Sequence, residues 1–118
     1  IELIQLGGMV RATSTSVVGA SATTMMSTMS CRKLFLGVDG LDVRHGLTTS
    51  SPQEANLNQC MIAAAQEVIV VTDHSKLGVR GFSKICATDR IDKIITDDQA
   101  PQETVRLLED NGIEVICV

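Results

Sequence analysis

The sequence predicts an α/β fold, with a mostly parallel sheet and helices on both of its faces. Short apolar runs alternate with helix-like segments along the chain, which is the order of elements in α/β proteins. These runs are continuously apolar, as in strands that are buried on both faces. Three of them stop at an aspartate, at Asp39, Asp73 and Asp97. Since ligands of open α/β sheets bind outside the carboxyl ends of the strands, we expect the binding site at this edge.

The first part of the chain is predicted to begin with a strand and to continue into a helix. Residues 1–6 have the composition of a strand and end at the breaker pair Gly7-Gly8. The Thr- and Ser-rich stretch 10–18 is interpreted as a short strand with loops. Residues 20–30 are predicted to be helical, because three methionines recur there at helical spacing.

A strand, a loop and a well-signalled helix are predicted next. Residues 33–38 form a short apolar run, which predicts a strand buried on both faces. Residues 41–50 show no clear period and are interpreted as a loop. The helix after them has Ser51 as a candidate N-cap, Pro52 at its first position and Glu54 three residues after the cap.

The last part of the chain is predicted to contain four strands and one helix. A proline at the start and a glycine just past the end delimit this helix. The strands are expected at 67–72, around 82–86, at 93–96 and at 113–118, and the helix at 101–111.

Composition limits the classes of function. The 118 residues suffice for one domain, which we assign to 1–118. Ten basic and fourteen acidic side chains give a net charge of −4, and the aromatic residues are two phenylalanines. A nucleic-acid surface needs clustered Lys and Arg or stacking rings, so this chain is not expected to bind DNA by itself. No apolar stretch reaches the ~18 residues of a membrane span, so no membrane partner is expected.

The cysteines and the first residues predict the cellular setting. Four widely spaced cysteines form no Cys-x-x-Cys pair, and neither histidine lies near one of them in sequence. We therefore expect no metal site and no cofactor, and we interpret the cysteines as reduced thiols of a cytoplasmic protein. The first residues show no signal-peptide pattern and have the composition of mid-strand, so we expect the chain to be truncated at its N-terminus.

The densest group of polar residues surrounds the strand end at Asp39. Glycines there allow close approach of a ligand, hydroxyl groups suit phosphate or sugar oxygens, and carboxylates accept from sugar hydroxyls. The helix start at 51–54 adds partial positive charge for an anion. A purely structural alternative remains, in which Asp39-Gly40 is a turn and Glu54 completes a capping box.

A second polar group, Asp73-His74-Ser75-Lys76, follows the next strand. Lys76 is placed to meet a phosphate or a carboxylate as a point charge, although a solvated surface lysine is the alternative. His74 beside Ser75 does not indicate a nucleophile, because consecutive side chains rarely converge.

Several short motifs follow one another in a characteristic order along essentially the whole chain. They include Gly-Val-Asp-Gly, Gly-Leu-Thr-Thr and Asp-x-Ser-Lys. Together they closely resemble the C-terminal effector-sensing domain of DeoR-type bacterial transcriptional regulators. The closing segment from residue 92 also resembles that family's pattern of strand, aspartate, helix and final strand. The matching segments are 6–11, 16–19, 33–40, 46–49, 54–55 and 71–78.

This resemblance implies a fold like that of ribose-5-phosphate isomerase and glucosamine-6-phosphate deaminase, with a phosphorylated sugar as effector. In such regulators an N-terminal winged helix-turn-helix binds the operator, so DNA is expected as a partner only through a module that this chain lacks. The family's first strand and helix, whose Asp-x-Gly-Ser/Thr-Thr loop helps to cradle the phosphate, are also expected to be missing. Regulators of this type generally self-associate, so a homo-oligomer is expected.

A sugar-phosphate isomerase or deaminase on the same scaffold is the alternative function. Isomerase-type enzymes have an acidic residue after the strand-end aspartate and a lysine in the following Gly-rich segment. Here those positions hold Gly40 and Thr48-Thr49, which cannot shuttle protons at neutral pH. We therefore predict a sensor of a sugar-metabolism repressor, without catalytic residues.

Eleven residues are predicted to bind the ligand. Asp39, Asp73 and Glu54 are assigned to sugar hydroxyls or to the loops that bind them, and Lys76 to the phosphate or to a carboxylate partner. Hydroxyl groups and glycine backbones are expected to donate to phosphate oxygens. This last group comprises Ser16, Thr48, Thr49, Gly7, Gly8, Gly19 and Gly40.

Overall fold

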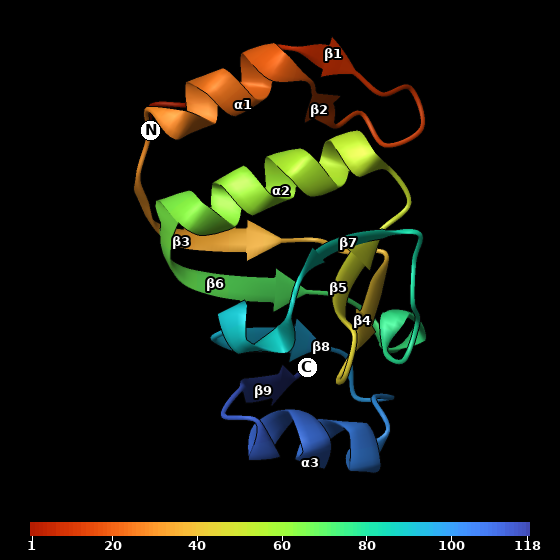
Figure 1. Cartoon of the computed structure of the whole chain (residues 1–118). Coiled ribbons are helices and arrows are strands. Elements are labelled where there is room, and N and C mark those ends of the chain that lie inside the picture. The colour runs from red at the N-terminus through yellow and green to blue at the C-terminus, as the bar shows by residue number, and fades with distance from the viewer.

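Four parallel strands, in the order β3-β6-β8-β9, form the central sheet in a computed structural model that describes residues 1–118 (Figure 1). This arrangement confirms the predicted α/β class with a parallel sheet. The strands and helices predicted at 20–30, 33–38, 67–72, 82–86, 93–96, 101–111 and 113–118 are all present, with ends shifted by at most three residues. The elements of this layer are β3 (Cys31–Leu36), α2 (Pro52–Ala64), β6 (Ala65–Val71), β8 (Lys93–Thr96), α3 (Gln102–Asp110) and β9 (Glu114–Cys117).

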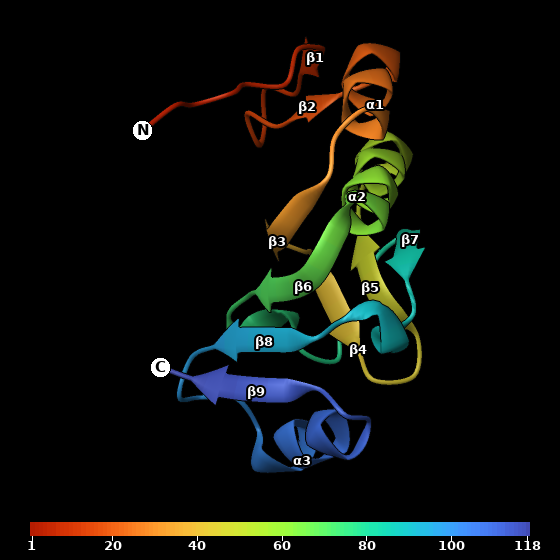
Figure 2. The ribbon, with the colours of Figure 1, turned by 90° about the vertical axis from the view of Figure 1, so that its left-hand side faces the viewer.

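One face of this sheet carries the core. Ile62 of α2 and Leu108 of α3 join strand residues such as Val70 and Ile94 in a single buried cluster. The helices therefore pack on the same side of the sheet, which differs from the expected arrangement on both faces (Figure 2). The reason is topological: each parallel connection steps in the same direction across the sheet, and right-handed crossovers in one direction place the two crossover helices, α2 and α3, on one face.

The strand predicted to be buried on both faces, β3, is an edge strand that pairs only with β6. Leu36 points into the core, whereas the neighbouring Phe35 is 62% exposed on the opposite face. The prediction of burial on both faces is therefore wrong for β3. The same exposed face carries ion pairs between β6, β8 and β9, where the ammonium of Lys93 lies 2.9 Å from Glu67 and 3.7 Å from Glu114.

A second, antiparallel sheet lies beside the carboxyl ends of the parallel strands. It consists of β4 (Gly40–Asp42), β5 (Gly46–Thr49) and β7 (Ser83–Cys86), and the short 3-10 turns η1 (His74–Lys76) and η2 (Thr88–Arg90) flank β7 in the chain. The predicted loop at 41–50 is therefore wrong. All four residues of β5 are buried, so the strand lacks the polar and apolar alternation that would have revealed it.

The N-terminal part forms a small layer of its own against α2. Strands β1 (Met9–Val10) and β2 (Val17–Val18) make an antiparallel hairpin, and α1 (Ala20–Ser27) packs on α2 through a second buried cluster. The strand predicted at 1–6 is wrong. This segment is extended and mostly exposed, and it forms no strand because no other segment pairs with its backbone (Figure 2). None of the three helices is long and apolar enough to cross a membrane.

Candidate functional site

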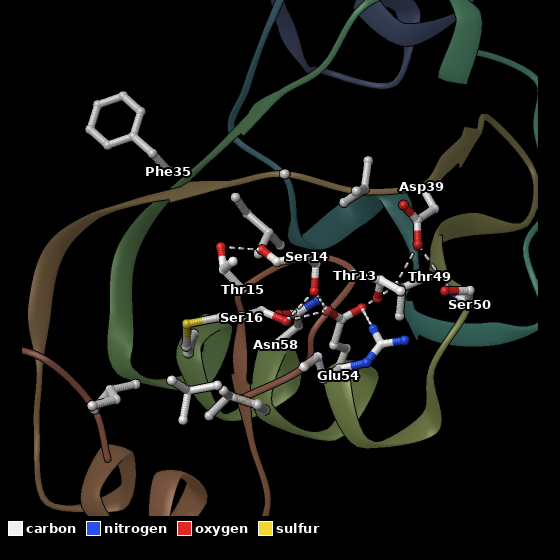
Figure 3. A pocket seen from close by; sticks show the side chains of 18 of the residues that line it. Thr13, Ser14, Thr15, Ser16, Phe35, Asp39, Thr49, Ser50, Glu54 and Asn58 are labelled. Carbon is white, nitrogen blue, oxygen red and sulfur yellow. Dashed lines mark hydrogen bonds and ion pairs between the residues drawn. The ribbon is translucent and has the colours of Figure 1, made fainter. Parts of the chain in front are cut away.

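A cavity of about 820 Å³ opens between the hairpin β1–β2, the end of β3 and the start of α2 (Figure 3). It lies at the carboxyl edge of the parallel sheet, where the order of strands and aspartates predicts a ligand site. Its apolar lining includes Leu6, Val17, Phe35, Leu57 and Met61. Its polar lining consists of Gln5, Arg11, Thr13, Ser14, Thr15, Ser16, Asp39, Thr49, Ser50, Glu54 and Asn58.

Glu54, in the first turn of α2, joins three segments of the chain. The helix begins there because Ser51 accepts a hydrogen bond from the Glu54 backbone N–H at 3.3 Å and Pro52 starts the first turn. On the carboxylate, Oε1 accepts from Ser16 at 2.5 Å, and Oε2 accepts from Thr49 at 3.0 Å and pairs with Arg11 at 2.8 Å. Both oxygens are thus already occupied by partners from β5 and the hairpin.

Electrostatics keep this carboxylate ionised. Burial works to raise the pKa of Glu54, but hydrogen bonds from Ser16, Arg11 and Thr49 and the charge of Arg11 lower it below its ordinary value. The side chain is only 16% exposed, so its ion pair with Arg11 lies largely out of water. Of the two predicted roles, the structure therefore favours that of holding the surrounding loops over that of binding a sugar hydroxyl.

Asp39 follows β3 and has free capacity toward the cavity. Its Oδ2 accepts from the Thr49 hydroxyl at 2.8 Å and from the Ser50 backbone N–H at 3.0 Å, which leaves Oδ1 for a ligand. The hydrogen bond from Thr49 is the largest cause that lowers the pKa of Asp39, and the charge of Lys76 contributes. The Thr49 hydroxyl has one proton and lies within reach of Glu54 as well, so the two carboxylates share a single donor.

The loop between β1 and β2 supplies four hydroxyl groups to the wall. It is closed by hydrogen bonds from the Arg11 N–H to the Ser16 carbonyl at 2.8 Å and from the Thr15 N–H to the Arg11 carbonyl at 2.7 Å. Thr15 has a φ of 54°, in the left-handed region that a β-branched residue rarely adopts. We call residues 11–16 the hydroxyl loop. Its hydroxyl-bearing members are Thr13, Ser14, Thr15 and Ser16.

Of the predicted residues, four line the cavity: Ser16, Asp39, Thr49 and Glu54. Thr48 and Gly40 lie next to it but face away. Thr48 is 5% exposed, and its hydroxyl accepts from the Gly81 N–H at 2.7 Å.

Close packing around Gly40 explains why no side chain is present there. A Cβ on Gly40 would lie 2.4 Å from the Val79 carbonyl oxygen and 2.6 Å from the Thr48 hydroxyl. Gly40 and Thr48 thus pack β4 and β5 against the segment 79–81, behind the wall that Asp39 and Thr49 form.

The three remaining predicted glycines do not line the cavity. Gly8 packs against β2, where a Cβ would lie 2.7 Å from the Val17 side chain. Gly19 precedes α1 with a φ of 103°, and Gly7 has open space around it. The first two shape the hairpin and the helix start that carry the hydroxyl loop.

Asp73 precedes η1 and Lys76 ends it, and both lie outside the lining. Asp73 caps this turn by accepting from the Ser75 N–H at 2.8 Å, and the ring of His74 lies 2.9 Å from Asp97. One ligand atom each of Asp73, His74 and Asp97 lies within 4.8 Å of the others, but these atoms are held in hydrogen bonds along the turn. Lys76 is close enough to Asp39 for its charge to lower the pKa of that carboxyl.

Most lining residues were missed from the sequence, and Arg11, Asn58 and Met61 show how some of them could have been found. Arg11 belongs to a matching segment but was not chosen as a binding residue. Asn58 and Met61 come four and seven residues after Glu54, so they lie on the same face of α2. This helical spacing could have predicted them from the sequence. Phe35 and Leu6 could not be found in this way, since they belong to segments predicted to be strands, the first of them buried on both faces.

The fold and the cavity define a class of protein: an α/β ligand-binding domain with a polar pocket at the carboxyl edge of a parallel sheet. The sequence model described as the DeoR C terminal sensor domain matches residues 1–98. The chain belongs to this family of sensor domains, as its motifs predicted.

The curated relatives are transcriptional regulators. The chain is 40% identical over all of its 118 residues to the "Putative aga operon transcriptional repressor" of Escherichia coli O157:H7, of which it covers 44%. It is 36% identical over 98% of its length to the HTH-type transcriptional regulator GlpR of Haloferax volcanii, and 33% identical over 98% to the HTH-type transcriptional repressor GlcR of Bacillus subtilis. It covers 45% of each of these two proteins, so the chain spans a little under half the length of these relatives.

Proposed function

We propose that this domain binds a phosphorylated sugar and thereby controls the DNA affinity of a repressor of sugar metabolism. The effector is the direct partner of this chain, and DNA is contacted through a separate helix-turn-helix module of the same protein. We further propose that the protein is cytoplasmic and acts as a homo-oligomer. The family match and the repressor names of two relatives support the regulatory part of this proposal.

The observation that carries the ligand class is the two-sided chemistry of the cavity. Its volume of about 820 Å³ lies in the range of small-molecule pockets. Asp39 offers a free carboxylate oxygen to sugar hydroxyls, and Arg11 and the Thr13 hydroxyl offer donors to an anion. Leu57 and Met61 provide an apolar floor for the carbon face of a sugar.

The same lining supports a sensor over an enzyme. Proton transfer to a sugar needs a group whose pKa lies near the working pH. The lining contains no histidine, cysteine or lysine, and the pKa values of its two carboxyls, Asp39 and Glu54, are lowered. Both are therefore fixed as carboxylates at neutral pH, and no acid partner faces them in the cavity.

A thermal-shift screen of sugar phosphates beside their unphosphorylated parent sugars tests this proposal. A ligand that binds only the native state raises the melting temperature by an amount that grows with the logarithm of its concentration above Kd, so a phosphorylated sugar should raise it and its parent should not. The active compound should then change operator binding by the full-length regulator in a mobility-shift assay. If no sugar phosphate raises the melting temperature, or if the protein interconverts aldose and ketose phosphates, the proposal is wrong.

A further inference from the structure

We propose that β9 is an interface strand, which pairs antiparallel with β9 of a second copy of the chain and joins two four-stranded sheets into one. This inference rests on the proposed function, whose homo-oligomer it deepens by naming the surface and the register of pairing. The register centres on Ile116, which lies opposite the partner's Ile116.

Strand β9 ends the central sheet with a free edge. It pairs with β8 alone, in a parallel ladder. The backbone N–H groups of Glu114 and Val118 donate to carbonyls on the β8 side, at 3.2 and 2.9 Å. Because backbone groups alternate in direction along a strand, the N–H and C=O groups of Val115 and Cys117 face the outer edge, where no other segment of the protein pairs with them.

This edge lacks the features that keep exposed edge strands from pairing. Proteins protect such edges with lysines, prolines or bulges. Strand β9 has the sequence Glu-Val-Ile-Cys, and its ladder with β8 runs without a register shift. The opposite edge strand, β3, carries two adjacent exposed cations, Arg32 and Lys33, which oppose pairing with a second copy. Of the two free edges, β9 is therefore the one that fits strand addition.

Exposed apolar side chains accompany the free edge. Ile116 and Val118 are 37% and 76% exposed on the strand, and Leu107 is 46% exposed on α3, which lies beside β9 (Figure 1). Strand addition takes its affinity from backbone hydrogen bonds and from the side chains next to them. A twofold axis perpendicular to the sheet places both copies of α3 on the same face of the joined sheet, where Leu107 gives them an apolar surface to share.

The alternation of side chains fixes the register. Val115 packs against the core, so Ile116 lies on the open face of the sheet. With a perpendicular twofold axis, residues that lie opposite each other have side chains on the same face. One register then engages both free residues of each strand, and it places Val115 opposite the partner's Cys117. In this register Glu114 lies opposite the partner's Val118, so no like charges face each other across the interface.

Cysteine cross-linking of the full-length regulator tests this register. In Ile116→Cys/Cys117→Ser, the two new thiols lie across the twofold axis on Cα atoms about 4.5 Å apart, which is within disulfide range. We expect mild oxidation to convert more than about half of this variant into disulfide-linked dimer. Glu114→Cys/Cys117→Ser is the matched control on the same face, since its thiols are carried by Cα atoms about 14 Å apart and should give less than about a tenth as much dimer.

The control can be turned into a second test. Adding Val118→Cys to Glu114→Cys/Cys117→Ser should restore cross-linking, because Glu114 lies opposite the partner's Val118 in the proposed register. A shift of the register by one pair would leave this triple variant without cross-links.

A charge at the centre of the interface tests self-association itself. Ile116→Lys places two lysines opposite each other, so sedimentation equilibrium should show a dissociation constant at least about tenfold higher. Val71 provides the control, because it is 45% exposed on the same face and lies in register with Ile116, but two strands from the edge. Val71→Lys should therefore change the dissociation constant by less than about twofold.

The outcomes separate this inference from the proposed function. A wild-type regulator that is monomeric at micromolar concentration contradicts the proposed homo-oligomer and the interface together. An oligomer that does not cross-link through Ile116→Cys, or that keeps its dissociation constant in Ile116→Lys, assembles through another surface, and the inference alone is wrong. Equal cross-linking of the Glu114→Cys control would indicate random collision and also overturns the register.

Discussion

Two polar groups follow neighbouring parallel strands, and they differ in what their carboxylates contact. After β3, Asp39 and Glu54 bind side chains from segments far apart in the sequence, the hairpin loop and β5, and they enclose a cavity. After β6 and β8, Asp73 and Asp97 bind mainly the turn that they begin or the neighbouring η1, and they line no cavity. We call these the β3 group and the β6 group.

The difference shows that a strand-end aspartate does not by itself make a binding site. The β6 group uses its carboxylates to cap short turns, a local role that needs no third segment. The β3 group gains its cavity because the hairpin β1–β2 folds over it and is held there by Glu54. The site thus depends on long-range contacts.

Removal of the Glu54 side chain should have the largest effect on stability. Glu54→Ala deletes an ion pair and three hydroxyl hydrogen bonds in a largely buried setting, so we expect a loss of about 2–3 kcal/mol in the free energy of unfolding. Asp97→Ala in the β6 group should cost clearly less, because that carboxylate is more exposed. Urea denaturation of both variants measures the difference, and equal losses would contradict the contrast between the two groups.

Substitution of Gly40, which lies behind the cavity wall, should have the next-largest effect on stability. Gly40→Ala places a Cβ 2.4 Å from the Val79 carbonyl oxygen, so the two segments must move apart, at a cost of about 1–3 kcal/mol. Gly37→Ala is the control, since its Cβ meets no atom within 4 Å and should change stability by less than about 0.5 kcal/mol. A Gly40→Ala protein as stable as the control would mean that this glycine is not required for packing.

Low pH should destabilise the folded protein, because protonation of Glu54 weakens the contacts of the β3 group. Its pKa is lowered on folding, so its contribution to stability is complete above the ordinary value of about 4.5 and is lost as the pH falls through the lower folded value. Glu54→Gln removes this titration. Melting temperatures measured from neutral pH downward should therefore fall more steeply below about pH 4.5 for the wild-type protein than for the variant. If the melting temperatures of the two proteins fell equally with pH, the pKa of Glu54 would be the same in the folded and the unfolded protein.

The smallest effect concerns the strained hydroxyl loop. Thr15→Gly relieves the left-handed conformation, whereas Thr13→Gly only adds flexibility, because Thr15 alone among non-glycine residues has a positive φ. We expect Thr15→Gly to be about 1 kcal/mol less destabilising than Thr13→Gly. Thermal unfolding of the pair measures this, and a larger loss for Thr15→Gly would locate the strain elsewhere.

The sequence predicted the parallel core and two of the three cavity charges. Continuous apolar runs correctly predicted the parallel strands, and the cap at Ser51 correctly predicted the start of α2. Asp39 was identified because it ends a strand, and Glu54 because it lies at the start of a helix. The hairpin β4–β5 was missed because burial of every β5 residue removes the alternation. Arg11 was missed because its role follows from a fold-back of the chain onto α2, which no local pattern encodes.

Helix α2 runs into β6 without an intervening loop, since Ala64 ends the helix and Ala65 begins the strand. The first turn of this helix carries Glu54, and its middle packs on α1 through Leu57. The chain reverses direction at this junction, so α2 and β6 lie side by side with no flexible segment between them (Figure 1). A displacement of the first turn by a ligand would therefore have β6 and α1 as its first recipients, at the opposite end of the helix and along its side.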